Sequence, residues 1–176
     1  VLSLVAPLPA TTVPVGSALG LVLAHDVVAA VDLPGFDNSA MDGYAVRAAE
    51  LAGASTETPV VLPVAGDVAA GDTRHHVLPV GHTLRIMTGA PMPDGLDAVI
   101  PVENVVVLEL DAEQRPQRIR LLHAVLPGAN VRRRGQDISA GDLVIPSGTR
   151  IGAPERMVLA ALGIADVPVR KLPVAA

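Results

Sequence analysis

Apolar residues in this chain gather in short runs that are rich in β-branched side chains and end at Gly, Pro or Asp. Such runs are typical of β-strands, because branched side chains pack well on a pleated surface and Gly and Pro favour turns. We therefore predict that residues 60–150 form a compact, mostly β region with twisted or barrel-like sheets. The runs are PVVLPVAG, LRIMTG, DAVIPVENVVVLEL, RIRLLHAV and DLVIPSGT.

Helical patterns are fewer and lie toward the two ends of the chain. The segment SALGLVLAHDVV has Ser17 in an N-cap position before an apolar run, and APERMVLAALGI has Pro154 in a first turn and Gly163 at a stop. The segment AMDGYAVRAAEL fits either a strand or a short helix near Ala48. The sequence thus predicts a mainly β protein with a few helices, of the α+β class.

Helical segments at both ends with β structure between them predict two lobes. Residues 1–44 together with 141–176 would form an elongated lobe of helices and strands. Residues 45–140 would form an inserted, β-barrel-like lobe. A chain of 176 residues is long enough for one domain or for two small ones.

Composition narrows the range of functions. Half of the residues are hydrophobic, at 50%, yet Phe36 and Tyr44 are the only aromatic residues, so stacking on nucleic-acid bases has almost nothing to work with. The formal net charge of −5 argues against a surface that coats a polyanion, although a local basic site is compatible with it. The absence of cysteine removes disulfides, thiolate ligands and cysteine nucleophiles.

The first 24 residues carry no charged side chain, but they lack the basic start of a signal peptide, and three prolines interrupt any apolar helix. No stretch approaches the roughly 18 to 20 apolar residues of a membrane span. The cytoplasm is therefore the expected compartment.

Several common sites have no counterpart in the sequence. The five histidines, His25, His75, His76, His82 and His123, do not follow a zinc-binding spacing. There is no glycine-rich dinucleotide motif after a strand, no P-loop, and no serine nucleophile elbow.

The stretch DNSAMDGYAV, residues 37–46, is unusually polar. Asp37, Asn38 and Ser39 favour turns, because their side chains bond the nearby backbone. A second carboxylate follows at Asp42, next to Gly43, which allows close approach of another group. Asp42 is either a further turn residue or a functional group, and the residues alone leave both interpretations open.

A second stretch, RIMTGAPMPDG at 85–95, ends an expected strand at Thr88 and Gly89 and turns through prolines. A hydroxyl and free backbone N–H groups at a strand end can hold an oxyanion or lie near a metal-bound water. The alternative is an ordinary Gly-Pro turn.

A third stretch, NVRRRGQD at 130–137, concentrates three arginines. Arginine suits bidentate contact with phosphate and other oxyanions. If the segment is extended, Arg132 and Arg134 face one way and Arg133 the other. Asp137 would orient an arginine or contact a cation, and the alternative is a solvated run of charges.

Taken together and in order, these motifs resemble the molybdopterin molybdenumtransferase family, called MoeA in bacteria and represented in animals by the C-terminal domain of gephyrin. The resemblance covers residues 17–173, and DNSAMDGYAV and RIMTGAPMP are highly specific to it. It implies insertion of molybdate into adenylylated molybdopterin with release of AMP and with a divalent cation such as Mg²⁺.

The resemblance also implies roles for individual residues. Asp42, Thr88 and Asp137 would be catalytic, and Arg132, Arg134, Ser39 and Gly89 would bind substrate. Gln136 departs from the family, whose members usually have Glu there, so one charge is lost. The main Mg²⁺ ligands are expected in an α/β domain that family members carry after the segment VPVRKLPVA, and no metal ligand is assigned in this chain.

This chain therefore resembles the two N-terminal lobes only. In the family, dimerisation places these lobes over the α/β domain of the other subunit, which implies a homodimer with a shared site and an inactive isolated fragment. The alternative is a noncatalytic dimerisation or scaffold module, as in gephyrin's receptor clustering.

Overall fold

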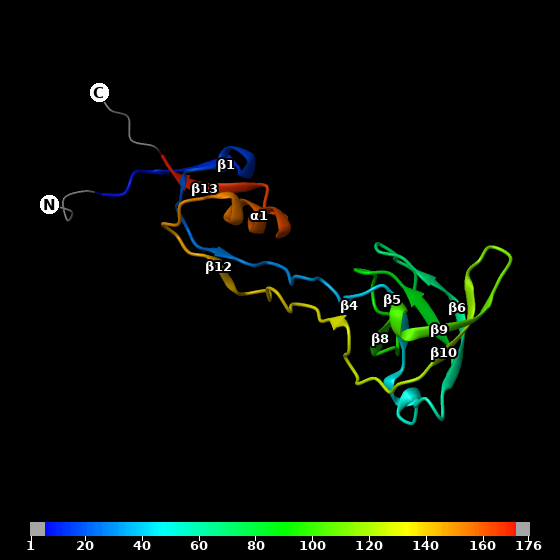
Figure 1. The fold of residues 1–176 in the computed structure, drawn as a ribbon. Coiled ribbons are helices and arrows are strands. Elements are labelled where there is room, and N and C mark those ends of the chain that lie inside the picture. The colour runs from blue at the N-terminus through cyan, green and yellow to red at the C-terminus, as the bar shows by residue number, and fades with distance from the viewer. Residues whose placement is uncertain (1–5, 172–176) are drawn as a thin grey trace. The chain divides into compact units, whose positions relative to one another are not determined.

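The computed structural model describes residues 6–171, and these fall into two compact units (Figure 1). The terminal unit consists of the chain before Phe36 and after Arg134, and the inserted unit is Phe36–Arg134. The chain therefore leaves one unit, builds the other, and returns. The boundaries between the units follow Gly35 and Arg134. Both lie several residues before the boundaries predicted from the sequence, after residues 44 and 140.

The terminal unit is built from short antiparallel ladders. Its three-stranded sheet has the order β1-β13-β2, and a separate ladder pairs β12 with β3. Its strands and its 3-10 helix are β1 (Ala10–Pro14), η2 (Val15–Ser17), β2 (Val22–Leu23), β3 (Val27–Val28), β12 (Leu143–Ile145) and β13 (Asp166–Arg170).

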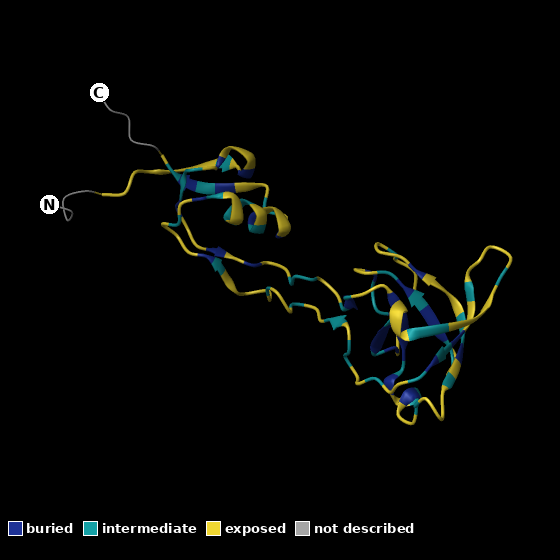
Figure 2. Ribbon diagram, in the orientation of Figure 1, coloured by how far each residue is buried: buried dark blue, intermediate teal, exposed yellow. Residues whose placement is uncertain are grey.

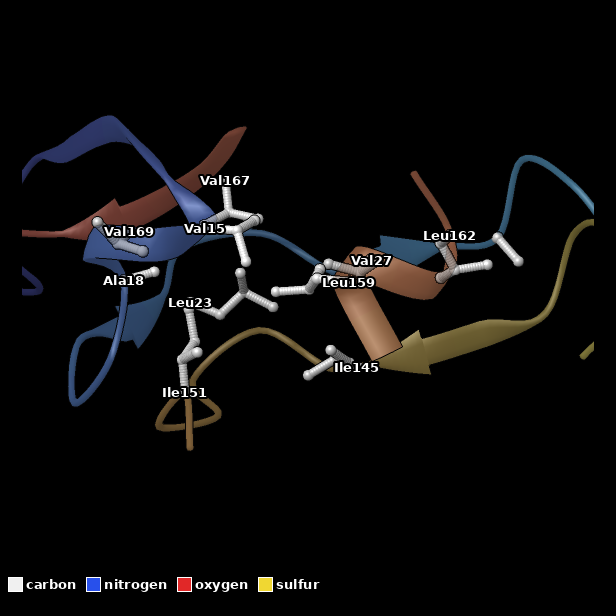
Figure 3. Packing of buried hydrophobic residues seen from close by; sticks show 11 residues of the cluster. Val15, Ala18, Leu23, Val27, Ile145, Ile151, Leu159, Leu162, Val167 and Val169 are labelled. Atoms are coloured by element: carbon white, nitrogen blue, oxygen red, sulfur yellow. The ribbon is translucent and has the colours of Figure 1, made fainter. Parts of the chain in front are cut away.

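The predicted C-terminal helix is confirmed as α1 (Ala153–Ala161), the only α-helix among residues 6–171. Pro154 lies in its first turn, and the Glu155 carboxylate accepts the Gly152 N–H at 2.8 Å, which satisfies a donor at the helix start. Leu159 is fully buried and packs with Leu23 in the core of this unit (Figure 3).

The helix predicted for SALGLVLAHDVV is wrong. Ser17 ends η2, and the residues that follow form β2 and β3. Leu23 and Val27 are both buried, four residues apart, a spacing that a helix and these two strands both satisfy. Pairing decides between the two, because Leu23 donates its N–H to the Thr149 carbonyl at 2.9 Å and lies opposite Val169.

The inserted unit is a curled six-stranded sheet of order β8-β5-β7-β6-β10-β9 (Figure 1). Only the β6–β7 pair is parallel among the described strands of this sheet. The mainly β fold class with a barrel-like inserted lobe is thereby confirmed. The strands are β5 (Gly43–Val46), β6 (Val60–Val68), β7 (Thr83–Ile86), β8 (Ala98–Pro101), β9 (Val105–Leu110) and β10 (Pro116–Leu121).

Strand β5 is buried along its whole length (Figure 2). Tyr44 and Val46 pack into one apolar cluster, which includes Ile119, whereas Ala45 faces a second cluster, which includes Leu84. Successive side chains of a strand point to opposite faces, so both faces of the sheet are covered at β5. The residue just before β5, Asp42, is thus attached to a rigid, central strand.

The ambiguous segment AMDGYAVRAAEL contains both predicted elements, since β5 is followed by the 3-10 helix η3 (Ala48–Leu51). The Asp97 carboxylate accepts the Ala48 N–H at 2.7 Å and so satisfies a donor of that short helix. The run DAVIPVENVVVLEL is divided between β8 and β9 by η4 (Val102–Asn104). No helix within residues 6–171 is long and apolar enough to cross a membrane.

Candidate functional site

The first two motifs and the start of the third, residues 130–134, are distant in the sequence but lie side by side in the inserted unit. Strand β4 (Asn38–Ser39) pairs with β11 (Val131–Arg132), the start of the arginine motif. On its other side, Ser39 donates its N–H to the Ala90 carbonyl at 3.0 Å and accepts the Gly89 N–H at 2.8 Å. The turn after β7 is therefore fixed against DNSAMDGYAV by backbone hydrogen bonds.

Asp42 and Thr88 form the centre of this arrangement. The Asp42 Oδ1 atom accepts the Thr88 backbone N–H at 2.8 Å and the Thr88 hydroxyl at 2.7 Å. Both side chains are exposed. The second carboxylate oxygen, Oδ2, has no hydrogen-bond partner within the described part of the chain. The pair thus presents an oriented carboxylate with one open oxygen, and we call it the Asp42–Thr88 pair.

The same two contacts keep Asp42 ionised. The Thr88 backbone N–H, and after it the Thr88 hydroxyl, hold the pKa of Asp42 below the usual range of an aspartate. A carboxyl whose pKa is lowered by folding stabilises the fold above its unfolded pKa, near pH 4, and loses this contribution as the pH falls through its folded pKa. Asp42 therefore carries a full negative charge at neutral pH.

Thr88→Val should raise the pKa of Asp42 toward its ordinary value, because the hydroxyl donor is lost, while the Thr88 backbone N–H keeps part of the shift. The measurement is an NMR titration of the Asp42 side-chain carboxyl carbon between pH 2 and 6. Thr58→Val, at an exposed hydroxyl of the same unit that bonds Ser55 and Gly53, serves as the control and should leave the Asp42 titration unchanged. An unchanged Asp42 midpoint in Thr88→Val would show that the hydroxyl contributes nothing.

Gly89 makes the turn after Thr88 with φ of 78°, a backbone conformation that other residues adopt at a cost. The backbone N–H groups of this turn are already engaged: that of Thr88 by Asp42, that of Gly89 by Ser39, and that of Ala90 by Met87. The prediction of free N–H groups for an oxyanion is therefore wrong. The turn instead presents the Thr88 side chain.

Ser39 has a positioning role. It is fully buried, its hydroxyl donates to the Met41 carbonyl at 2.5 Å, and Asn38 likewise donates its side-chain amide to the Phe36 carbonyl at 3.1 Å. These local bonds confirm the turn interpretation of both residues. The expected contact between Ser39 and substrate is not supported, because a buried side chain engaged within its own turn is not accessible to a ligand.

A turn residue would form side-chain hydrogen bonds with its neighbours in the sequence, but the Asp37 carboxylate does not. It accepts the Arg134 backbone N–H at 2.8 Å and the Arg133 guanidinium at 2.6 Å, across 97 and 96 residues of sequence. The Arg134 N–H first, and the Arg133 side chain after it, lower the pKa of Asp37. Asp37 thus anchors the arginine motif, and Arg133 is the arginine that is used for this attachment.

The remaining predicted residues divide between the two units. Arg132 lies in β11 opposite Asn38, and Arg134 ends the inserted unit. Asp137 lies in the terminal unit, where its N–H donates to the Leu33 carbonyl at 2.9 Å. The structure therefore places all the predicted site residues except Asp137 in one unit: Ser39, Asp42, Thr88, Gly89, Arg132 and Arg134.

Within residues 6–171 no cluster of three or more His, Cys, Asp or Glu side chains is arranged to hold a metal ion. Asp42 offers one open oxygen, whereas Mg²⁺ prefers six oxygen ligands, commonly one or two carboxylates with substrate phosphates and waters. The described residues do not by themselves make a magnesium site.

One neighbouring residue was quoted in the sequence motif but given no role. Arg85 lies on β7 opposite Tyr44, and its positive charge contributes to the lowered pKa of Asp42. The sequence feature that could have identified Arg85 is that it is the single charged residue in the strand TLRI. Charged residues are rare in buried strands unless they have a partner or a function.

Comparison with known proteins shows that this chain matches the N-terminal region of one protein family. Residues 1–163 match the family model of the MoeA N-terminal region, domains I and II. The chain is 44% identical over 158 residues to molybdopterin molybdenumtransferase 2 of Mycobacterium tuberculosis strain CDC 1551, with 90% of this chain and 37% of the relative covered. It is 39% identical over 170 residues to molybdopterin molybdenumtransferase of Synechococcus elongatus, with 96% and 40% covered.

A crystal structure of the molybdopterin biosynthesis MoeA protein from Pyrococcus horikoshii OT3 has a similar fold, with a TM-score of 0.85 and 35% sequence identity. The match covers 94% of this chain and 42% of that protein. The chain thus spans about two fifths of the length of the proteins it resembles.

Proposed function

The chain belongs to the family of MoeA N-terminal regions, and from this we propose that it is the N-terminal part of a transferase that inserts molybdate into adenylylated molybdopterin and releases AMP. The observation that carries the proposal is the Asp42–Thr88 pair. It joins the two most specific motifs of the sequence through hydrogen bonds of 2.8 and 2.7 Å.

The chemistry of the pair suits this reaction. Thr88 donates its only hydroxyl proton to Asp42, so the Thr88 oxygen is left to accept a hydrogen bond from a ligand. Asp42 is held ionised and keeps Oδ2 for a hydrogen-bond donor or a substrate-bound cation. Preorganised charge of this kind, held at the start of the buried strand β5, is suited to stabilise a transition state.

The other residues have supporting roles in this proposal. Arg132 and Arg134 neutralise phosphate or molybdate oxygens, since a guanidinium binds oxyanions in bidentate fashion. Gly89 allows the turn that presents Thr88. The catalytic role expected for Asp137, a residue of the terminal unit, stays a prediction. We assign no step to Mg²⁺, whose ligands would have to come largely from substrate and from outside the described residues.

The exposure of Asp42 and Thr88 supports a site that is completed by another part of the protein. We therefore propose a homodimer in which the pair faces the substrate-binding domain of the second subunit. The family membership and the coverage of about two fifths of each relative motivate this arrangement.

The 176-residue chain by itself should release no AMP from adenylylated molybdopterin in a molybdate-dependent manner, because the proposal assigns most of the substrate-binding surface to the part of the relatives that this chain does not cover. The measurement is chromatographic AMP quantification with and without molybdate. A full-length relative with this chain in place of its own first two domains serves as the positive control and should be active. Robust AMP release by the isolated chain would contradict the divided site, and an inactive hybrid that is folded would contradict the proposed activity.

A further inference from the structure

Arg85 occupies a defined place beside the Asp42–Thr88 pair. Its Cα lies opposite Tyr44 on β5 and opposite Asp67 on β6. Asp42 precedes Tyr44 by two residues, so alternation puts both side chains on the same face of the sheet, with Asp42 as the diagonal neighbour of Arg85. Asp42, Arg85 and Asp67 thus form a row of polar groups across neighbouring strands. The row lies at one end of the sheet face whose remaining side chains, Tyr44 among them, pack into an apolar cluster.

Arg85 is a half-buried residue, and its guanidinium makes no hydrogen bond or ion pair within residues 6–171. Some arginines of the same unit are engaged: Arg47 donates to the Leu78 carbonyl at 2.8 Å, and Arg74 pairs with Asp72 at 2.6 Å. The side chains of Arg118 and Arg120 on β10, like that of Arg85, make no hydrogen bond or ion pair within residues 6–171. A guanidinium drawn partly out of water gains from accepting partners, because its donors lose hydration there. Arg85 therefore has binding capacity that the fold does not use.

The charge of Arg85 acts on the groups around it. The pKa of Asp42 is lowered mainly by the two Thr88 hydrogen bonds, while desolvation raises it. The charge of Arg85 makes a smaller contribution to the lowering. Burial raises the pKa of Tyr44, and Arg85 opposes this rise. These effects place the guanidinium within electrostatic reach of both residues, in agreement with the strand register.

We propose that Arg85 is the oxyanion-binding group of the Asp42 site, whose guanidinium takes a tetrahedral oxyanion of the substrate, a phosphate or molybdate, next to the Thr88 hydroxyl. The identity of this oxyanion rests on the proposed function. The planar fork of donors on arginine fits such oxygens in bidentate fashion.

The carboxylates on either side make the site selective. Asp42 and Asp67 flank Arg85 and repel a free anion, so the preferred ligand carries a hydrogen-bond donor or a bound cation beside its oxyanion. A phosphate ester with neighbouring hydroxyl or amine groups has this character, whereas inorganic pyrophosphate or molybdate should bind the same guanidinium more weakly. Removing the Asp67 charge should therefore strengthen the binding of a simple anion.

The test is an NMR titration of the isotope-labelled 176-residue chain with inorganic pyrophosphate and, separately, with sodium molybdate. We expect shifts at the Arg85 side-chain Nε and at the Thr88 and Gly89 amides. Arg85→Gln should weaken binding about tenfold, the usual order for a charged hydrogen bond, and Asp67→Asn should tighten it. The anion that binds more tightly identifies the source of the oxyanion.

Arg118→Gln is the matched control, because Arg118 is an exposed arginine on β10 of the same sheet with no hydrogen bond or ion pair in the described chain. It should leave the affinity unchanged. Equal weakening by Arg118→Gln, or an Arg85→Gln affinity equal to that of the unaltered chain, would overturn the proposal. So would shifts confined to Arg132–Arg134.

This experiment is independent of turnover. Arg85-dependent binding together with an inactive hybrid enzyme would sustain the anion site and refute the proposed function. An active hybrid whose turnover and anion affinity are both unchanged by Arg85→Gln would support the proposed function and refute the anion site at Arg85.

Discussion

Gly43→Ala should unfold or severely destabilise the inserted unit. A Cβ at position 43 would overlap the Ile100 carbonyl oxygen and would lie 2.9 Å from the Ile100 carbonyl carbon and from Val99 Cγ1. Both obstacles belong to β8, which pairs directly with β5, so relief requires these two strands to separate. We expect a loss of about 3 kcal/mol in the free energy of unfolding, the upper part of the range for overpacked cores.

Thermal unfolding followed by circular dichroism measures this effect, and a fall in Tm of more than about 10 °C is expected for a unit of this size. Gly53→Ala is the matched control, because no atom lies within 4 Å of an added Cβ there and its φ is not in the left-handed region. The control should stay within about 0.5 kcal/mol of the unaltered chain. Similar melting of both variants would contradict the close β5–β8 approach.

The glycine beside Asp42 is thus explained by packing. In the sequence, Gly43 suggested close approach of another group, and the group that approaches is the backbone of the neighbouring strand. This approach fixes the start of β5, and with it the direction in which Asp42 leaves the sheet.

Asp42→Asn in an active full-length hybrid should reduce AMP release by about 100-fold, the lower end of the range for removal of one preorganised electrostatic group. An asparagine oxygen still accepts the two Thr88 hydrogen bonds, so the geometry is retained and the negative charge alone is removed. The Tm should change by less than about 3 °C for the same reason. The measurements are steady-state AMP release and thermal unfolding of the same preparations.

Asp111→Asn is the control for this change. Asp111 is also an aspartate that accepts backbone N–H groups, those of Glu113 and Arg115, and it lies in the turn between β9 and β10 of the same unit. It should leave AMP release unchanged. Wild-type turnover in Asp42→Asn would return Asp42 to the status of a turn residue and remove the observation on which the proposed function rests.

The sequence predicted the fold class because its strand signals are local. Runs such as PVVLPVAG and RIRLLHAV became β6 and β10, and the helix from Ala153 has its own proline, capping glutamate and terminal glycine. The segment after Ser17 misled because its apolar spacing fits both structures. Its strands form only because partners from the returning chain, β12 and β13, are available to it.

In the candidate site, too, the sequence predicted the residues, but their contacts depend on segments that are far apart along the chain. Residue chemistry and family resemblance drew attention to Asp42, Thr88 and the arginines, but the bond between Asp42 and Thr88 spans 46 positions and depends on β5 lying next to β7. Asp42, Ser39 and Met87 also engage the backbone N–H groups that were expected to be free, and Ser39 is itself buried. Whether a polar group faces a ligand or its own chain is decided by its neighbours in space.

The sequence by itself therefore determined the mainly β class, the family, and the motif residues, because strand propensity, turn chemistry and residue order are properties of short segments. Tertiary structure alone decided that Arg133 is held by Asp37, that Gly43 makes room for β8, and that Arg85 lies near Asp42 without a hydrogen bond or ion pair to the rest of the described chain. These facts depend on strand register, and register is set by contacts between segments that are far apart along the chain.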